Sequence, residues 1–348
     1  MIPASPAHDR RTRARVPRSA ATFCIGIVLA PIAGLSCATS PSARKPAAPA
    51  RIYVTNQLDN TASVIDGATH KIVVTVRVGV SPAQMAVSPD RKSVYIANTG
   101  SNTVSVLNTD TNSIARTIAL PPRSRPIDLA VNPNGRYLYI ADGGSNRVSV
   151  LDTRAKRVVA SVRVGSQPLS IAAAPDGKTV YTANSGSGDV SVIDAQTNRV
   201  VRAIPTGRFP SGVAVTPNGA SLYVTNELSG VTVINTGNGT VAARLRTPSP
   251  FSVATSPNGD RAYVTSLGPG RVTAIDTRTH RVSSTVSVGP YGTDPFTVRA
   301  TGNAVYVANQ AANTLSVIDQ HTFRVTATIA TGNSPYGIAV VQPRPTNG

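Results

Sequence analysis

The chain has 348 residues and is 41% hydrophobic, which is enough apolar material for a substantial core, and it contains no tryptophan. Lys and Arg outnumber Asp and Glu by 34 to 16, and this net charge of +18 favours anionic surroundings: a phosphate-rich wall polymer, lipid head groups or nucleic acid. The only cysteines are Cys24 and Cys37, so the chain beyond them has no disulfide framework, thiolate metal site or cysteine nucleophile.

Residues 1–37 have the pattern of an export signal. Five arginines between Arg10 and Arg18 precede an apolar run from Ala20 to Leu35. This run is too short to span a bilayer, which needs about 20 apolar residues. Without this segment the chain keeps 29 Lys and Arg against 15 Asp and Glu, so the exported part is still basic.

Gly34-Leu35-Ser36-Cys37 resembles the bacterial lipoprotein cleavage box, in which small residues precede a cysteine that is then lipidated. Gly34 stands where that box usually has Leu, and ordinary cleavage nearby is the alternative. Residues 38–50 are rich in Pro and Ala and predict an extended tether. We therefore expect an extracytoplasmic protein, either secreted or lipid-anchored at Cys37.

A tetrapeptide of the type Tyr-Val-Thr-Asn returns through the rest of the chain. Its seven tyrosines are spaced by 40 to 44 residues. Repeats of this length indicate propeller blades or a solenoid, because one unit cannot bury its own apolar face. The copies begin at Tyr53, Tyr95, Tyr139, Tyr181, Tyr223, Tyr263 and Tyr306.

The unit from Ser211 to Thr247 predicts four short strands and no helix. They are expected at 213–215, 222–225, 231–234 and 241–245, and we call these strand positions a, b, c and d. Pro217-Asn218-Gly219 predicts a tight a-to-b turn in which Gly supplies the positive φ.

An Asp or Asn ends strand c in every unit. Because these residues are periodic, we interpret them as side-chain caps of the c-to-d hairpin and not as catalytic residues. They are Asp66, Asn108, Asp152, Asp194, Asn235, Asp276 and Asp319.

The two ends of the repeat region favour a closed ring over an open array. Residues 51–56 read as a b-type strand with no strand a before it. Residues 334–340 match the a-type stretch 81–87 and have no strand b after them. Pairing three strands from the front with one from the back predicts an all-β, seven-bladed β-propeller of four-stranded antiparallel blades over 51–342, with a tail at 343–348.

The tetrapeptide, the Pro-Asp/Asn-Gly turn and the Val-Ile-Asp strand resemble the YVTN β-propeller repeat family of bacterial and archaeal exported and surface-layer-like proteins. The resemblance covers Arg51 to about Gln342. It implies a propeller fold and an extracytoplasmic location more than any chemistry.

Propellers usually bind ligands at the face formed by their d-to-a and b-to-c loops. Residues that break the repeat there are the candidate site. They are the charged residues Arg123, Arg125, Arg208, Asp128 and Asp294, with Phe209, Phe251, Phe296 and Tyr336 as stacking surfaces. We expect the three arginines to offer guanidinium groups to an anionic ligand, although three solvated loop arginines would give the same pattern.

Catalysis has less support in the sequence. Propeller lactonases and the streptogramin lyase, which this chain resembles in fold, rely on His, Glu and Arg or on a metal held by acidic residues. Here His70, His280 and His321 all fall in c-to-d turns on the opposite face, and Glu227 is the only Glu. No His, Cys or Asp cluster has metal-ligand spacing, so we expect no metal and no cofactor.

The sequence therefore predicts a monomeric, envelope-associated scaffold that binds a protein, glycan or other anionic ligand without catalysis. A lactonase- or lyase-like enzyme and an extracytoplasmic nucleic-acid-binding propeller are the alternatives. The second rests on charge alone, because the basic residues are distributed and aromatic interleaving is sparse.

Overall fold

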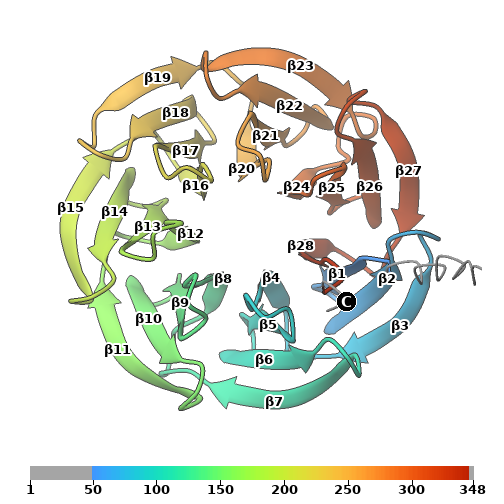
Figure 1. The fold of residues 1–348 in the computed structure, drawn as a ribbon, viewed down its shortest axis with the longest axis horizontal. Helices are drawn as coiled ribbons and strands as arrows, with labels where there is room; N and C mark the ends of the chain where they lie inside the picture. The colour runs from blue at the N-terminus through green and yellow to red at the C-terminus, as the bar shows by residue number, and fades with distance from the viewer. Residues whose placement is uncertain (1–48, 345–348) are drawn as a thin grey trace, which may run out of the picture. The chain divides into compact units, whose positions relative to one another are not determined.

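The computed structural model describes residues 49–344, so the predicted signal with Cys37, most of the tether and the last four residues lie outside the described part. The described chain forms 28 strands in seven four-stranded antiparallel sheets, which are arranged as blades around a central channel (Figure 1). The prediction of an all-β, seven-bladed propeller is confirmed. No helix among residues 49–344 is long and apolar enough to cross a membrane.

We number the blades in chain order and give the strands of each from the channel outward. Blade 1 contains β28 (Pro335–Val341), β1 (Arg51–Asn56), β2 (Thr61–Asp66) and β3 (Ile72–Arg77); blade 2, β4 (Pro82–Val87), β5 (Ser93–Asn98), β6 (Thr103–Asn108) and β7 (Ser113–Ala119); blade 3, β8 (Pro126–Val131), β9 (Tyr137–Asp142), β10 (Arg147–Asp152) and β11 (Arg157–Arg163); blade 4, β12 (Pro168–Ala173), β13 (Thr179–Asn184), β14 (Asp189–Asp194) and β15 (Arg199–Pro205). Blade 5 contains β16 (Pro210–Val215), β17 (Ser221–Asn226), β18 (Gly230–Asn235) and β19 (Val241–Leu245); blade 6, β20 (Pro250–Thr255), β21 (Arg261–Ser266), β22 (Arg271–Asp276) and β23 (Arg281–Ser287); blade 7, β24 (Pro295–Ala300), β25 (Ala304–Asn309), β26 (Thr314–Asp319) and β27 (Val325–Ala330).

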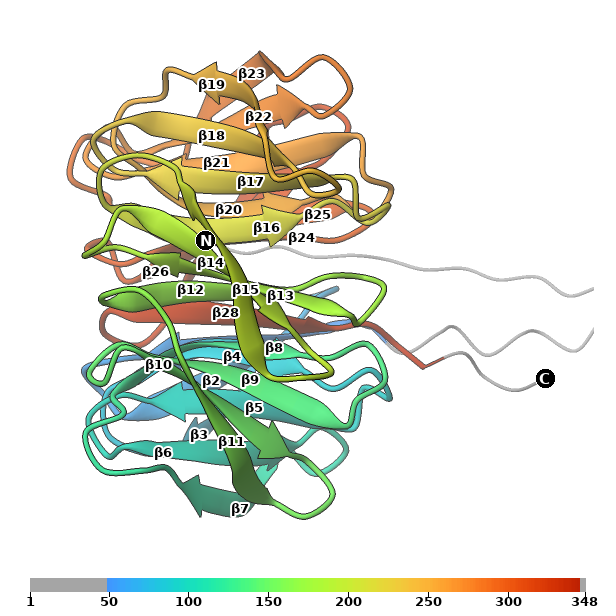
Figure 2. The same cartoon turned by 90° about the vertical axis from the view of Figure 1, so that its left-hand side faces the viewer.

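Blade 1 closes the ring as predicted, with one strand from the end of the chain and three from its start. Tyr53 pairs with Ala339 and Val54 with Ile338, so β28 is the innermost strand of the blade that begins at β1. In the side view β28 runs along the channel and ends at the face on the right (Figure 2). The closure pairs both edges that an open array would leave exposed.

The hydrophobic core lies between neighbouring blades. In every blade the second strand is buried along nearly its whole length, while the fourth strand forms the exposed outer rim. Tyr53 and Val64 of blade 1, for example, pack with Met85 and Ile96 of blade 2. Each blade therefore buries its apolar surface only by stacking on the next one, which is why the sequence must repeat.

The repeated tetrapeptide stabilises the blades and their junctions. The hydroxyl group of Tyr53 donates to Oδ1 of Asn112 in the next blade at 2.7 Å. At the end of the motif in blade 2, the Nδ2 of Asn98 donates to Thr103 and Ser105 of the adjacent strand at 3.0 and 2.9 Å. Its first and last residues are thus fixed by structure and not by a ligand.

The Asp and Asn residues that end each third strand cap the hairpin that follows, as predicted. Oδ1 of Asp66 accepts the backbone N–H groups of Ala68 and Thr69, both at 2.9 Å. Hydrogen bonds from the Thr69 backbone and from the Arg51 side chain lower the pKa of Asp66 to about 2, against a smaller contribution from burial. The same pair of contacts recurs at Asn108, Asp152, Asp194, Asn235, Asp276 and Asp319.

A second recurring contact joins a blade to the loop that enters the next one at four of the seven junctions. The residue before each innermost-strand proline has a positive φ of 40 to 56°. At four junctions an Asn in the preceding b-to-c loop accepts that residue's N–H through its side-chain oxygen, and we call this contact the Asn latch. The pairs are Asn60 with Ser81, Asn102 with Arg125, Asn146 with Gln167, and Asn313 with Ser334.

Candidate ligand site in the central channel

The innermost strands line the channel with one nearly invariant position. The fifth residue of the strand is Ala in six blades and Arg299 in blade 7. The alanines are Ala86, Ala130, Ala172, Ala214, Ala254 and Ala339. The third residue of the strand is polar or Gly throughout, and in blade 3 it is Asp128. The two charged side chains of the innermost strands thus come from β24 and β8, on opposite sides of the channel (Figure 1).

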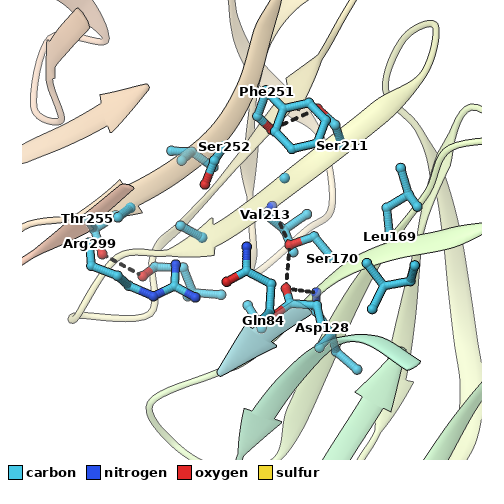
Figure 3. Close-up of a pocket in the computed structure, with 18 of the residues that line it drawn as sticks. Gln84, Asp128, Leu169, Ser170, Ser211, Val213, Phe251, Ser252, Thr255 and Arg299 are labelled. Atoms are coloured by element: carbon cyan, nitrogen blue, oxygen red, sulfur yellow. Dashed lines mark hydrogen bonds between the residues drawn. The ribbon is translucent and has the colours of Figure 1, made fainter. Parts of the chain in front are cut away.

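Two cavities occupy the channel, and Arg299 lines both. The first has a volume of about 310 Å³ and is lined by Asp128, Ser170, Phe251 and Tyr336 toward the end where the innermost strands begin (Figure 3). The second has a volume of about 680 Å³ and lies toward the end where those strands finish. The first cavity is at the lower limit of the size that small organic ligands occupy in proteins.

Arg299 brings a positive charge into this cavity, and the opposite charge that acts on it there is that of Asp128. Its Nη1 donates to the carbonyl oxygen of Val298 at 3.2 Å. Among residues 49–344 it forms no direct ion pair. Burial lowers the pKa of Arg299, and the charge of Asp128 acts in the opposite direction. Because a guanidinium group carries five N–H donors, most of them remain for a ligand or water.

The carboxylate of Asp128 is held by the protein. Its Oδ1 accepts from the backbone N–H of Leu129 at 2.8 Å, and its Oδ2 accepts from the Oγ of Ser170 and the N–H of Ile171 at 2.9 and 3.0 Å (Figure 3). Burial raises the pKa of Asp128, and the charge of Arg299 together with these hydrogen bonds opposes the rise. Asp128 therefore links β8 to β12 as well as facing the cavity.

Gln84 crosses the channel wall beside these charges. Its Nε2 donates to Oγ1 of Thr297 at 2.7 Å, although β28 lies between their strands. Gly337 of β28 leaves room for the crossing, because a Cβ there would come within 2.8 Å of the Cα of Gln84. The Oε1 of Gln84 is buried and has no hydrogen-bond partner among the described residues.

Phe251 and Tyr336 form one wall at the same end of the channel, and Phe296 packs against both of their rings. The ring centroids of Phe251 and Phe296 are 4.0 Å apart, and those of Phe296 and Tyr336 are 4.4 Å apart. All three are second residues of their strands, in blades 6, 7 and 1. Burial, and then the charge of Asp128, raise the pKa of Tyr336, so its hydroxyl group remains neutral. A planar ligand can stack on this wall.

Three of the predicted site residues thus line the channel, namely Asp128, Phe251 and Tyr336, and a fourth, Phe296, packs against the two aromatic rings. The loop arginines lie elsewhere. Arg123 and Arg125 are exposed on the loop before β8, and neither lines a channel cavity. Arg208 and Phe209 line a groove outside the channel. Asp294 joins the loop before β24 to the b-to-c loop of blade 6, because its Oδ1 accepts the N–H of Gly268 at 3.0 Å.

Arg299 was not among the residues predicted from the sequence. The prediction considered loop residues that break the repeat, whereas Arg299 breaks it within a strand. Alignment of the seven innermost strands from their first proline places it alone among alanines, so the signal was present in the sequence.

The histidines are in hairpin turns, as expected. Nδ1 of His280 lies 2.8 Å from the hydroxyl group of Tyr223 in the neighbouring blade, which is a contact between blades. Within residues 49–344 no three His, Cys, Asp or Glu side chains are grouped so that they could hold a metal ion.

The fold and the channel define a seven-bladed β-propeller with a charged, ligand-sized central cavity. The sequence model of the YNCE-like beta-propeller family matches residues 15–346, and the chain belongs to this family. The predicted membership of a YVTN-type propeller family is therefore confirmed.

Solved structures with the same fold are distant in sequence. A chain of Kuenenia stuttgartiensis hydrazine synthase is 21% identical, with a TM-score of 0.67 over 75% of this chain and 95% of that chain. A functionally unknown protein from Desulfotomaculum acetoxidans DSM 771 is 16% identical, with a TM-score of 0.71 over 84% of this chain and 99% of that chain. No curated protein sequence matches the chain. At these identities the likeness concerns the fold alone.

Proposed function

We propose that this protein is an exported binding protein that holds a small oxyanion-bearing molecule in its central channel and performs no catalysis on it. The observation that carries the proposal is Arg299, which forms no ion pair within residues 49–344 and stands at a channel position where the other six blades have Ala. Placing a cation in a partly buried cavity costs free energy unless an anion or water compensates it.

The lining suggests which small anion would fit. A carboxylate or phosphate group can accept two parallel N–H bonds from the guanidinium group of Arg299. A ring attached to that group can lie on the wall formed by Phe251 and Tyr336. In its ionised form Asp128 repels a second negative charge, so the other end of the ligand would be neutral or cationic.

The hydrogen bonds of Asp128, the carboxyl group of the first cavity, favour binding without catalysis. Asp128 lines the first cavity, and both of its oxygens already accept hydrogen bonds from the protein. A general base needs a free oxygen within reach of the proton that it removes. Asp128 is better placed to orient a ligand than to react with it.

Export and attachment to the envelope belong to the same proposal. They are supported by the signal-like residues 1–37 and by the positive charge of the rest of the chain.

The a-to-b and c-to-d turns, which share one face of the ring, hold nine Lys and Arg and four Asp. Ala50 and Pro343, near the two ends of the described chain, both contact turns of this face. Such a face is suited to an anionic wall or membrane surface. Recovery of the full chain in the cytoplasm after cell fractionation would contradict export.

Replacement of Arg299 by Ala tests the channel site. The variant restores the residue of the other six blades, so we expect it to fold normally. Calorimetric titration with benzoate, which combines a carboxylate with a ring, should give at least about tenfold weaker binding than for the unmodified protein, because charged hydrogen bonds contribute about 1.5–3 kcal/mol.

Two controls accompany the titration. Benzyl alcohol, which has the ring without the charge, should bind the two proteins alike. Arg163→Ala removes an exposed charge at the outer rim and should leave benzoate binding unchanged. Equal benzoate affinities for the unmodified protein and the Arg299 variant would refute the proposed site.

A further inference from the structure

A surface groove at the junction of blades 4 and 5 is separate from the channel. It has a volume of about 560 Å³ and lies between the loop at 185–188 and the segment at 205–209, with Arg244 beside it. It shares no lining residue with either channel cavity. Its occupant is therefore independent of the function proposed above.

The groove lies where the Asn latch is missing. At the preceding junction Oδ1 of Asn146 accepts the N–H of Gln167 at 2.9 Å. At the junction of blades 4 and 5 the corresponding residues are Gly188 and Phe209, and the N–H of Phe209 has no acceptor among the described residues. The junction thus lacks both a side chain and a hydrogen-bond acceptor at the same point.

Two other junctions also have Gly in place of the latch residue, but they are closed. A Cβ at Gly230 would lie 2.1 Å from the carbonyl oxygen of Leu245, and a Cβ at Gly270 would lie 2.6 Å from that of Pro290. At Gly188 the one atom within 4 Å of an added Cβ is the carbonyl oxygen of Gly207, at 3.1 Å. Among the three, only this junction has room for an added group.

Arg208 and Arg244 line the same groove as Phe209. Arg244 is held against blade 5, since its Nη1 donates to Oγ1 of Thr232 at 3.0 Å and also to the carbonyl oxygen of Thr206. The backbone N–H of Arg208 donates to Oγ of Ser229 at 3.0 Å, while its side chain is exposed. The side chain of Phe209 is 44% exposed.

We propose that this groove binds an oxyanion group, a carboxylate, sulfate or phosphate, which replaces the missing asparagine oxygen as acceptor of the Phe209 N–H. The guanidinium groups of Arg208 and Arg244 neutralise its charge, and an apolar part of the same molecule packs on the ring of Phe209. A backbone N–H beside two arginines is a combination that oxyanion sites commonly use.

Insertion of the missing latch tests this site. Gly188→Asn should supply the acceptor for the Phe209 N–H and fill the groove. Asparagine tolerates the positive φ of 74° at this position, so the fold should persist. The readout is the Phe209 amide resonance of ¹⁵N-labelled protein titrated separately with inorganic phosphate, sulfate and acetate. We expect a saturable downfield shift in the unmodified protein and none in Gly188→Asn.

Two further variants make the result specific. Arg208→Ser should weaken the binding of whichever of the three anions binds most tightly. The affinity should fall at least about tenfold, as the loss of a charged hydrogen bond implies. Asn146→Gly opens the N–H of Gln167 at a junction without this pair of arginines, and it should gain no anion site. The proposal is overturned if Gly188→Asn binds phosphate, sulfate and acetate as the unmodified protein does, or if Arg208→Ser binds them all unchanged. Arg299→Ala should leave this titration unaltered, which separates the two sites.

Discussion

Asp142 occupies the position at which five other blades have the Asn of the repeated tetrapeptide. Its Oδ2 accepts from the Oγ of Ser149 at 2.5 Å, but its Oδ1 has no hydrogen-bond partner among the described residues. Burial raises the pKa of Asp142 to about 6, against the lowering effect of the hydrogen bond from Ser149. Asparagine in this position would instead offer two donors, as Asn98 does in blade 2.

Asp142→Asn should therefore stabilise the protein at neutral pH. A folded-state pKa above the unfolded value favours the protonated form, so the Asp contributes best at low pH and loses stability as pH rises from about 4 to 6. A shift of about two units corresponds to about 3 kcal/mol, so we expect the variant to gain about 1–3 kcal/mol at pH 7.5.

Urea unfolding of both proteins at pH 4, 5.5 and 7.5 measures this difference. It should be small at pH 4 and grow with pH. A difference that stays constant across the three pH values would show that Asp142 ionises as it does in the unfolded chain.

Some of the individual site residues could be predicted from the sequence, and others could not. Asp128, Phe251, Phe296 and Tyr336 could be selected because they break the repeat close to the channel. Arg299 was missed because the blades were compared for loop residues that break the repeat, and Arg299 breaks it within a strand. The open N–H of Phe209 could not be predicted, since Gly188 reads in sequence as an ordinary loop glycine.

The loops that lead into the innermost strands share one backbone conformation. Each blade presents a residue with positive φ before its first proline, and four junctions support it with an Asn latch. Six of the seven residues that hold this positive φ are neither Asn nor Gly nor Asp, so the conformation is imposed by the junction and not by local preference. A latch should accordingly stabilise its junction.

Asn313→Gly removes the latch between blades 7 and 1 while keeping a residue that tolerates positive φ. We expect a loss of about 1 kcal/mol, the usual net contribution of one hydrogen bond. Asn313→Ala should cost more, because Ala adopts positive φ poorly. Denaturant unfolding of the two variants gives both values. Wild-type stability in both would mean that the contact between Asn313 and Ser334 contributes nothing.

The strand pattern of each blade followed from the sequence with little error, because alternating apolar residues and Pro-Asn-Gly turns are local signals. The positions of the loop side chains could not be predicted from the sequence. Arg123, Arg125 and Arg208 share a loop type, yet their distance from the channel depends on how each loop folds back on its neighbour.

The whole molecule depends on the pairing of β28 with β1. The number of blades could be predicted from the tyrosine spacing, and the closure from the unmatched strands at the two ends. Ile338 and Ala339 are buried within blade 1, so the last strand is part of the core.

Deletion of the chain from Ser334 onward should consequently destabilise the entire ring. We expect the melting temperature to fall by at least about 10 °C with a broadened transition, since several kcal/mol of burial are lost and each kcal/mol corresponds to about 2–4 °C in a protein of this size class. Scanning calorimetry measures both quantities. An unchanged temperature and cooperativity would contradict the closed ring.

The most direct test of the central claim, an anion held by Arg299 in the channel, is a crystal structure of the protein soaked with 4-bromobenzoate. The anomalous signal of the bromine reports where the ring lies. We predict one bromine position inside the channel, with the carboxylate on the guanidinium group of Arg299 and the ring against Phe251 or Tyr336, and its loss in Arg299→Ala. The absence of a bromine signal from the channel, or one in the channel that survives this substitution, would contradict the account.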